Sequence, residues 1–177
     1  LMTWGEALDW NYWVHSIVGG AHVIAAIIGL VLGPFIFTRI KGDRVHRISG
    51  YVFVLAMLTA NITALTLYDL NGGPNLFHAL ALLSLYSVGS GFYLLQRAVR
   101  QKSNKLLEDH ARAMMWAYFG LFAAGYAQIL SRILPPMLDD FGRAFMIIGV
   151  SIGVAGVLCS FLFRMASKRL VLKYPLE

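Results

Sequence analysis

Residues 33–51 join two long apolar stretches through a short basic turn, and this arrangement restricts what the chain can fold into. The turn, residues 39–47, holds four basic residues and one acid. It is too polar to lie in hydrocarbon and too short to form a domain of its own. Apolar stretches of about 20 residues match the ~30 Å hydrocarbon layer of a bilayer. We therefore interpret the segment as the connection between two membrane-spanning helices.

The composition and the placement of charge favour a multi-pass membrane protein. Hydrophobic residues make up 58% of the 177 and charged residues only 14%, whereas soluble domains carry about 25% charged residues. Of the 15 Lys and Arg residues, 13 fall in three short segments: 39–47, 97–112 and 164–173. This is the positive-inside pattern, not a nucleic-acid-binding surface. It predicts a protein of the inner (cytoplasmic) membrane, with the N-terminus outside and the C-terminus inside.

Five spans are predicted, at about 12–38, 46–67, 75–95, 109–130 and 141–163, within a single transmembrane domain covering 1–177. Residues 71–74 are expected to form an outer turn, and Ser131–Pro136 to break the fourth span on the same side. The predicted fold is an all-α integral membrane protein: a four-helix bundle that carries histidines, plus a fifth packing helix. Gly29 and Gly33, four residues apart, indicate close helix packing.

The two halves of the bundle resemble each other in the positions of their histidines. Span one carries His22, and span two opens with His46 after a basic turn. Span three carries His78, and span four opens with His110 after another basic turn. The spacing between the paired histidines is 24 residues in the first half and 32 in the second. We interpret this pattern as a duplication of a helix pair.

These four histidines are expected to form two layers. His22 and His78 lie 17 and 19 residues before the basic segment that ends their span, which is about 25–28 Å from the inner face. His46 and His110 lie beside the inner basic residues. In an up-down bundle spans one and three are diagonal, as are spans two and four. Each layer would therefore present two imidazoles facing one another across the bundle axis.

Two facing imidazoles per layer predict two bis-histidine haem b groups, with His22 and His78 as iron ligands in one layer and His46 and His110 in the other. The guanidinium groups of Arg39, Arg47 and Arg112 are suited to bind the carboxylates of the inner haem. Simpler interpretations also exist. The inner histidines can be ordinary interfacial residues, and an outer one can make a helix–helix hydrogen bond. His15 is interpreted as an interfacial residue, with a ligand or proton-relay role as the alternative.

Other metal centres fit the residues less well. A zinc or copper site needs three or four converging ligands, and each layer offers only two histidines. The only cysteine is Cys159, and the apolar interior of the spans holds no Asp or Glu for a di-iron centre.

The pattern Gly33-Pro34-Phe35 followed by His46-Arg47-x-x-Gly50-Tyr51 resembles a bacterial family of uncharacterised multi-pass membrane proteins with four recurring histidines. His78 and His110 match that family's second pair, and the resemblance covers about residues 12–130. It implies the fold and no particular activity. The two-layer arrangement also resembles, more distantly, the two-haem b-type cytochromes of eukaryotic vesicle membranes, whose reductant is ascorbate. That resemblance is architectural.

The predicted function is that of a di-haem b-type membrane cytochrome, an electron-transfer (oxidoreductase) component that carries electrons across the bilayer. Its expected partners are the lipid bilayer, a membrane protein or complex and quinol, and no nucleic acid. Two alternatives remain. One is a non-catalytic accessory subunit of a larger complex. The other is a small proton-coupled transporter in which His22 and His78 relay protons, helped by the few other polar residues in the spans: Thr59, Asn61, Thr63 and Gln128.

Overall fold

Five helices make up the fold in a computed structural model that describes residues 16–67, 76–138 and 140–174. Each is long and apolar enough to cross a membrane, which confirms the prediction of an all-helical protein with five spans. His15 and the predicted outer turn at 71–74 lie outside the described residues. The helices are α3 (Ile17–Thr38), α4 (Arg44–Ala64), α5 (Leu76–Gln101), α6 (Asn104–Leu138) and α7 (Phe141–Lys173).

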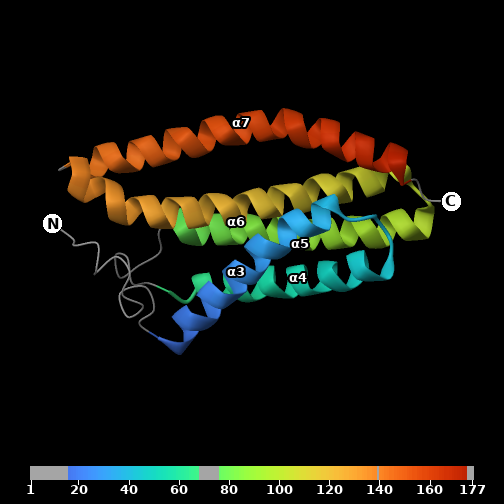
Figure 1. Cartoon of the computed structure of the whole chain (residues 1–177), viewed down its shortest axis with the longest axis horizontal. Helices are drawn as coiled ribbons and strands as arrows, with labels where there is room; N and C mark the ends of the chain where they lie inside the picture. The colour runs from blue at the N-terminus through green and yellow to red at the C-terminus, as the bar shows by residue number, and fades with distance from the viewer. Residues whose placement is uncertain (1–15, 68–75, 139, 175–177) are drawn as a thin grey trace.

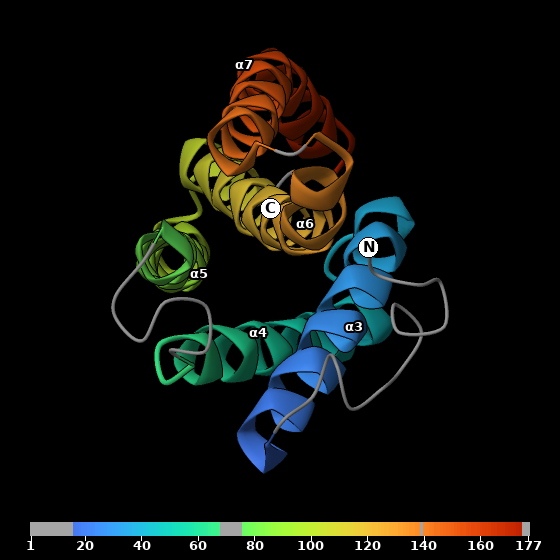
Figure 2. The same ribbon diagram turned by 90° about the vertical axis from the view of Figure 1, so that its left-hand side faces the viewer.

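Helices α3 to α6 form a ring in which each packs against its two neighbours. Helix α3 contacts α4 and α6, and α5 contacts the same two helices from the other side. The end-on view in Figure 2 shows α3 and α5 on opposite sides of the ring and α7 outside it. Helix α7 packs against α6. The diagonal pairs are therefore α3 with α5 and α4 with α6, as expected for an up-down bundle.

All three basic segments lie at one end of the bundle. In Figure 1 the α3–α4 connection, the α5–α6 connection and the C-terminal part of α7 gather on the right. The sequence around the first connection explains how it forms. Gly42 adopts a φ of 81°, in the left-handed region that glycine enters without strain. Asp43 caps α4 by accepting a hydrogen bond from the His46 backbone N–H at 2.6 Å, so α4 starts directly after the turn.

Three helices run further than the apolar segments predict. Helix α5 continues to Gln101 instead of ending near residue 95, α6 starts at Asn104 instead of 109, and α7 reaches Lys173 instead of 163. The added turns contain long basic side chains, which can reach the water phase while their backbone stays helical. Helices therefore do not end where the hydrocarbon ends, and only Lys102 and Ser103 separate α5 from α6.

The prediction that Ser131–Pro136 breaks the fourth span is wrong. Helix α6 continues through Pro135 and Pro136 to Leu138. A proline inside a helix removes one backbone hydrogen bond and favours a kink over a complete break. Figure 1 shows α6 bending toward α7 at this end, so the two prolines redirect the helix toward the α6–α7 connection.

Helix α3 approaches α6 closely through two of its glycines, Gly29 and Gly33. A Cβ atom at Gly29 would lie 2.7 Å from Leu121 Cδ2, and one at Gly33 would overlap the ring of Tyr118. The Tyr118 hydroxyl also donates to the Leu30 carbonyl at 3.3 Å, which ties the ring to the α3 backbone. The close packing indicated by the glycine spacing is thus the contact between α3 and α6.

Candidate functional site

A cavity of about 840 Å³ lies at the basic end of the bundle and contains two of the four histidines. His46 comes from the first turn of α4 and His110 from the second turn of α6, so the two arrive from diagonal helices. Apolar residues, contributed by all five helices, make up most of the wall. The other lining residues that matter here are Gly33, Lys41, Arg47, Gly50, Phe53, Gln96, Arg100, Met114, Met115, Leu170, Val171 and Tyr174.

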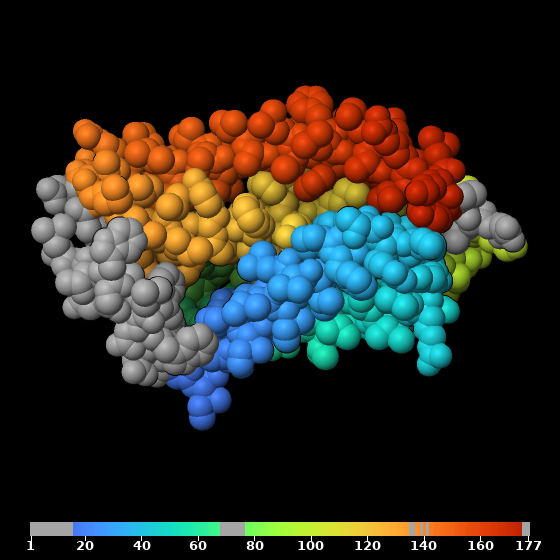
Figure 3. Space-filling model, viewed as in Figure 1, coloured from blue at the N-terminus to red at the C-terminus, as the bar shows by residue number. Residues whose placement is uncertain are grey.

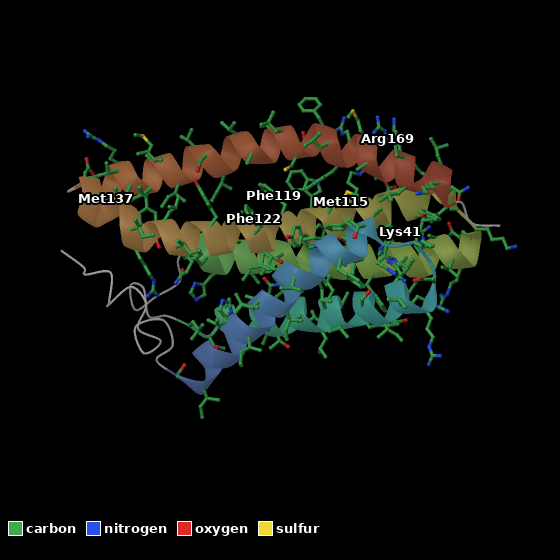
Figure 4. The ribbon with its side chains drawn as sticks, in the orientation of Figure 1. Lys41, Met115, Phe119, Phe122, Met137 and Arg169 are labelled. Carbon is green, nitrogen blue, oxygen red and sulfur yellow. The ribbon has the colours of Figure 1, made fainter. Side chains whose placement is uncertain are left out.

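The end of α7 forms part of this cavity. Its last turns contribute Leu170, Val171 and Tyr174 to the lining. Figure 3 shows the C-terminal part of α7 beside the end of α3 on the surface of the molecule. Lys41 and Met115, both labelled in Figure 4, lie toward this same end. The fifth helix is therefore more than an outer packing helix, since it closes one side of the site.

His110 has a defined tautomer. Its Nδ1 atom lies 2.8 Å from the Gly91 carbonyl oxygen on α5. A carbonyl can only accept a hydrogen bond, so Nδ1 carries the proton and Nε2 keeps its lone pair. A histidine that binds a metal through one ring nitrogen usually donates a hydrogen bond from the other, as Nδ1 does here. A Cβ at position 91 would lie 2.8 Å from Met114 Sδ, so glycine allows the two helices to come this close.

His46 leaves a polar atom unsatisfied inside the protein. Its Nδ1 is buried and makes no hydrogen bond to any residue that the structure describes. A buried nitrogen of this kind costs about 1–3 kcal/mol unless it finds a partner, and few such groups occur in native proteins. His46 also lines the cavity, but this Nδ1 atom is itself inaccessible, so the ring would meet a bound group there through Nε2.

Two of the three arginines predicted to bind haem carboxylates are already paired with acids. Arg39 Nη2 lies 3.2 Å from Asp43 Oδ2, and Arg112 contacts Asp109 and Glu108 on its own helix. Neither arginine lines the cavity, whereas Arg47 does. The pKa of Asp43 is lowered by the hydrogen bond from the His46 backbone and by the charge of Arg39.

Two cations that the sequence did not single out line the cavity beside Arg47: Lys41 and Arg100. The Lys41 Nζ donates to the carbonyls of Ile36 and Phe37 at 2.6 and 3.0 Å, so it caps the C-terminal end of α3. Burial lowers the pKa of Lys41. A helix-capping role is difficult to detect in a sequence, because most lysines after a helix extend into solvent.

The outer pair of histidines lies at the opposite end of the bundle. His22 sits in the second turn of α3, with Nδ1 2.9 Å from the Ala60 carbonyl and 3.2 Å from Thr63 Oγ1 on α4. Its Nε2 lone pair is therefore available, as in His110. His78 lies in the first turn of α5 and is only 8% exposed. Neither lines the inner cavity, so the structure brings His46 and His110 to one cavity and keeps His22 and His78 apart from it.

A further polar contact lies between α4 and α5. Asn61 Nδ2 donates to Ser84 Oγ at 3.0 Å and to the Met57 carbonyl at 2.6 Å. Both side chains are buried, and buried hydrogen bonds between membrane helices stabilise packing by about 0.6–2 kcal/mol. Ser84 lies in an apolar stretch where nothing in the sequence marks it as paired, so this contact was not predicted.

Over the ranges 16–67, 76–138 and 140–174, no three His, Cys, Asp or Glu side chains come together in a way that could hold a metal ion. Zinc and similar ions need three or four protein ligands.

A family model described as "Predicted membrane protein (DUF2306)" matches residues 19–163. The match supports the resemblance to an uncharacterised multi-pass membrane family, and it extends beyond residue 130 into α7. It includes all four of the layered histidines and excludes His15. Comparisons with curated proteins and with solved structures found no match. The resemblance to two-haem cytochromes remains a prediction.

Proposed function

The chain belongs to the family of predicted membrane proteins described as DUF2306, and from this premise we propose that it is a b-type membrane cytochrome. Its inner haem would occupy the cavity at the basic end of the bundle, held by His46 and His110. The observation that carries the proposal is the convergence of these two imidazoles, from diagonal helices, on one largely apolar cavity. The second haem, between His22 and His78, is retained from the sequence prediction.

The cavity suits a haem in size, donors and surroundings. Its volume of about 840 Å³ falls in the ~300–1,000 Å³ range of cofactor sites. His110 offers Nε2 with its other nitrogen fixed by Gly91, and His46 lines the same cavity from the diagonal helix. Phe53 and Met115 form part of the wall and are 2% and 6% exposed. An apolar wall of this kind would help to set the potential of a bound haem, together with the histidines that hold it.

The protein's own contribution would be to hold the haem in place and to set its reduction potential. A haem bound here would supply a one-electron carrier, which no side chain of the cavity can provide. His46 and His110 fix its position through ligands on α4 and α6. Gly91 holds the His110 ring in one tautomer, and the apolar wall excludes water. Electrons would pass between the two ends of the bundle, with a membrane protein complex or quinol as the expected partner.

The proposal predicts a characteristic absorption spectrum. Purified protein should show the α and Soret bands of six-coordinate b-type haem in a reduced-minus-oxidised difference spectrum. The amplitude should correspond to two haems per chain, or to one if only the inner cavity is occupied. Protein that folds without such bands, even when haem is supplied during synthesis, would contradict the proposal.

Gly50→Leu should prevent haem from entering the inner cavity without disturbing the fold. Gly50 lines the cavity, and a Cβ built there meets no described atom within 4 Å, so a larger side chain would extend into the open volume. We expect the inner-haem bands to fall at least about tenfold. Gly89→Leu is the matched control, because position 89 is equally open but exposed and outside the cavity. Equal haem content in the two variants would argue against the site.

We also propose an orientation: the protein lies in the inner membrane of a bacterium, and the basic end of the bundle faces the cytoplasm. In a Cys159→Ser background, Lys102→Cys in the α5–α6 connection should react with a membrane-impermeant thiol reagent only after the cells are permeabilised. Arg143→Cys, near the start of α7 at the other end, should react in intact cells. Labelling of Lys102→Cys in intact cells would reverse the orientation.

The transporter alternative has one observation in its favour. Helix α4 makes polar contacts with both of its neighbours, through Thr63 with His22 on α3 and through Asn61 with Ser84 on α5. A proton path would use such groups. Under that alternative, proteoliposomes would dissipate a pH gradient and the purified protein would lack haem bands.

A further inference from the structure

The cations at the basic end of the bundle differ in whether they are paired with an acid and in whether they line the cavity. Three acids lie at this end among the described residues, Asp43, Glu108 and Asp109, and each is paired with a cation outside the cavity. The cations in these pairs are Arg39, Lys105 and Arg112. The three cations that line the cavity are Lys41, Arg47 and Arg100, and no ion pair found in the described residues includes any of them. The basic end also holds seven described cations that neither line the cavity nor belong to such an ion pair: Arg44, Arg97, Lys102, Arg164, Lys168, Arg169 and Lys173. The cavity is thus distinguished by three lining cations whose charge no ion pair in the described residues compensates.

The cavity itself contributes no opposing charge. Among the described residues that line it, none is Asp or Glu. Low-dielectric walls with charge of one sign focus the electrostatic potential into a cleft and favour a ligand of the opposite sign. A ligand for this cavity therefore has two parts: an apolar body that matches the wall, and at least one anionic group at the end where the three cations lie.

Lys41 is the most firmly held of the three cations. Two of its three N–H donors are used by the carbonyls of Ile36 and Phe37, which leaves one donor for a ligand. Because the ammonium is fixed by the end of α3 and by the tight turn at Gly42, it loses little side-chain entropy on binding. Arg47 and Arg100 are exposed and can add planar, bidentate contacts to a carboxylate.

We propose that Lys41, Arg47 and Arg100 form a carboxylate-binding rim that holds the two acidic side chains of the inner haem. The inference rests on the proposed function, and it replaces Arg39 and Arg112 as carboxylate partners because their charges are used by neighbouring acids. The rim determines which way round the ligand enters: the carboxylates face the cytoplasmic end and the apolar edge faces the bundle core.

The test compares two forms of one ligand. Full-length protein made without haem is reconstituted in neutral detergent with iron protoporphyrin IX or with its dimethyl ester, whose carboxylates are blocked. Wild-type protein should bind the free acid about tenfold or more tightly than the ester, since charge-assisted hydrogen bonds are lost in the ester. Both forms should give the same bis-histidine bands, because the axial ligands are unchanged.

The rim variants should remove this preference. Lys41→Met and Arg100→Met should each reduce the ratio of free-acid to ester affinity by about threefold to tenfold and leave ester binding as it was. Arg100→Lys should retain part of the preference, because it keeps the charge but not the fork. Arg44→Met and Arg97→Met are matched controls, since both lie three residues before a rim residue on the same helix and neither lines the cavity.

The outcomes separate the rim from the proposed function. Equal affinity of wild-type protein for the acid and the ester, with bis-histidine bands in both, overturns the rim and leaves the cytochrome proposal standing. Loss of binding to anionic-lipid vesicles in the rim variants, with no change in the acid-to-ester ratio, assigns the cations to lipid headgroups and also overturns it. Failure of wild-type protein to bind either form overturns both proposals. If a Met variant does not fold, the lysine is replaced by arginine, or the arginine by lysine, instead. The ratio of free-acid to ester affinity of that variant then tests the rim.

Discussion

Replacing His110 with Asn should remove the inner haem while leaving the helix bundle intact. The Asn side-chain amide places a donor about where His110 has Nδ1, so the hydrogen bond to the Gly91 carbonyl, 2.8 Å long in the present structure, can be retained. The nitrogen that corresponds to Nε2 is absent, so an axial ligand is lost. We expect the inner-haem component of the difference spectrum to disappear, with the unfolding temperature within a few degrees of the wild-type value.

His46→Asn should give the same spectral loss, because both ligands are needed for six-coordinate haem. His22→Asn serves as the control at the other end of the bundle: it keeps a donor for the Ala60 carbonyl and should leave the inner component unchanged. If two haems are present, His22→Asn and His78→Asn should instead remove the second component. A stable His110→Asn protein with unchanged haem content would refute the assignment of His110, and the histidine would then be a helix–helix hydrogen-bond donor.

Gly33→Ala should destabilise the protein more than any other single methyl group added to these helices. A Cβ at this position would overlap the Tyr118 ring. The ring has little freedom to move, because its hydroxyl bonds to Leu30 and its edge packs on Phe37 with ring centroids 5.5 Å apart. Overpacking of this kind costs about 1–3 kcal/mol. The unfolding temperature in detergent should fall, and the cavity lined by Gly33 should bind haem less tightly.

Gly149→Ala is the matched control for this substitution. It adds the same methyl group to a membrane helix, at an exposed position where a Cβ meets no described atom within 4 Å, and it should be neutral or slightly stabilising. The cause can be tested with a double mutant: Tyr118→Leu should cost stability alone but should relieve part of the cost of Gly33→Ala, giving a coupling energy of about 0.5–3 kcal/mol. Additive effects would show that the overlap is not the reason for the loss.

The number of helices, their approximate positions and the clustering of basic residues at one end could be predicted from the sequence. Runs of apolar residues and the distribution of Lys and Arg are local properties, and in a membrane protein they are directly related to the bilayer. The diagonal placement of α4 and α6 followed from short connections in an up-down bundle. His46 and His110 stand on these two diagonal helices, and both line one cavity.

The helix ends were less well predicted, because hydropathy reports where the hydrocarbon ends and not where the backbone stops being helical. The prolines at 135 and 136 illustrate the limit: their local preference for a break is overridden by a long helix that bends instead. The outer layer, His22 and His78, was predicted by counting the residues between each histidine and the basic segment that follows it. Counting gives a level along the bundle axis, but it does not say toward which neighbour a side chain turns, and His22 turns to the α4 backbone.

The sequence by itself determined which residues carry charge, where the histidines stand along the chain, and that the basic segments lie at one end of the bundle. Only the tertiary structure decided which basic side chains pair with acids and which line the cavity. Arg39 and Arg112 looked equivalent to Arg47 as cations beside a histidine, yet they are neutralised by acids one helical turn away. Lys41 and Arg100 come from a turn and from a different helix, and they reach the cavity through packing alone. Pairing depends on side-chain direction and on distances of a few ångströms, and these are set by how the helices cross.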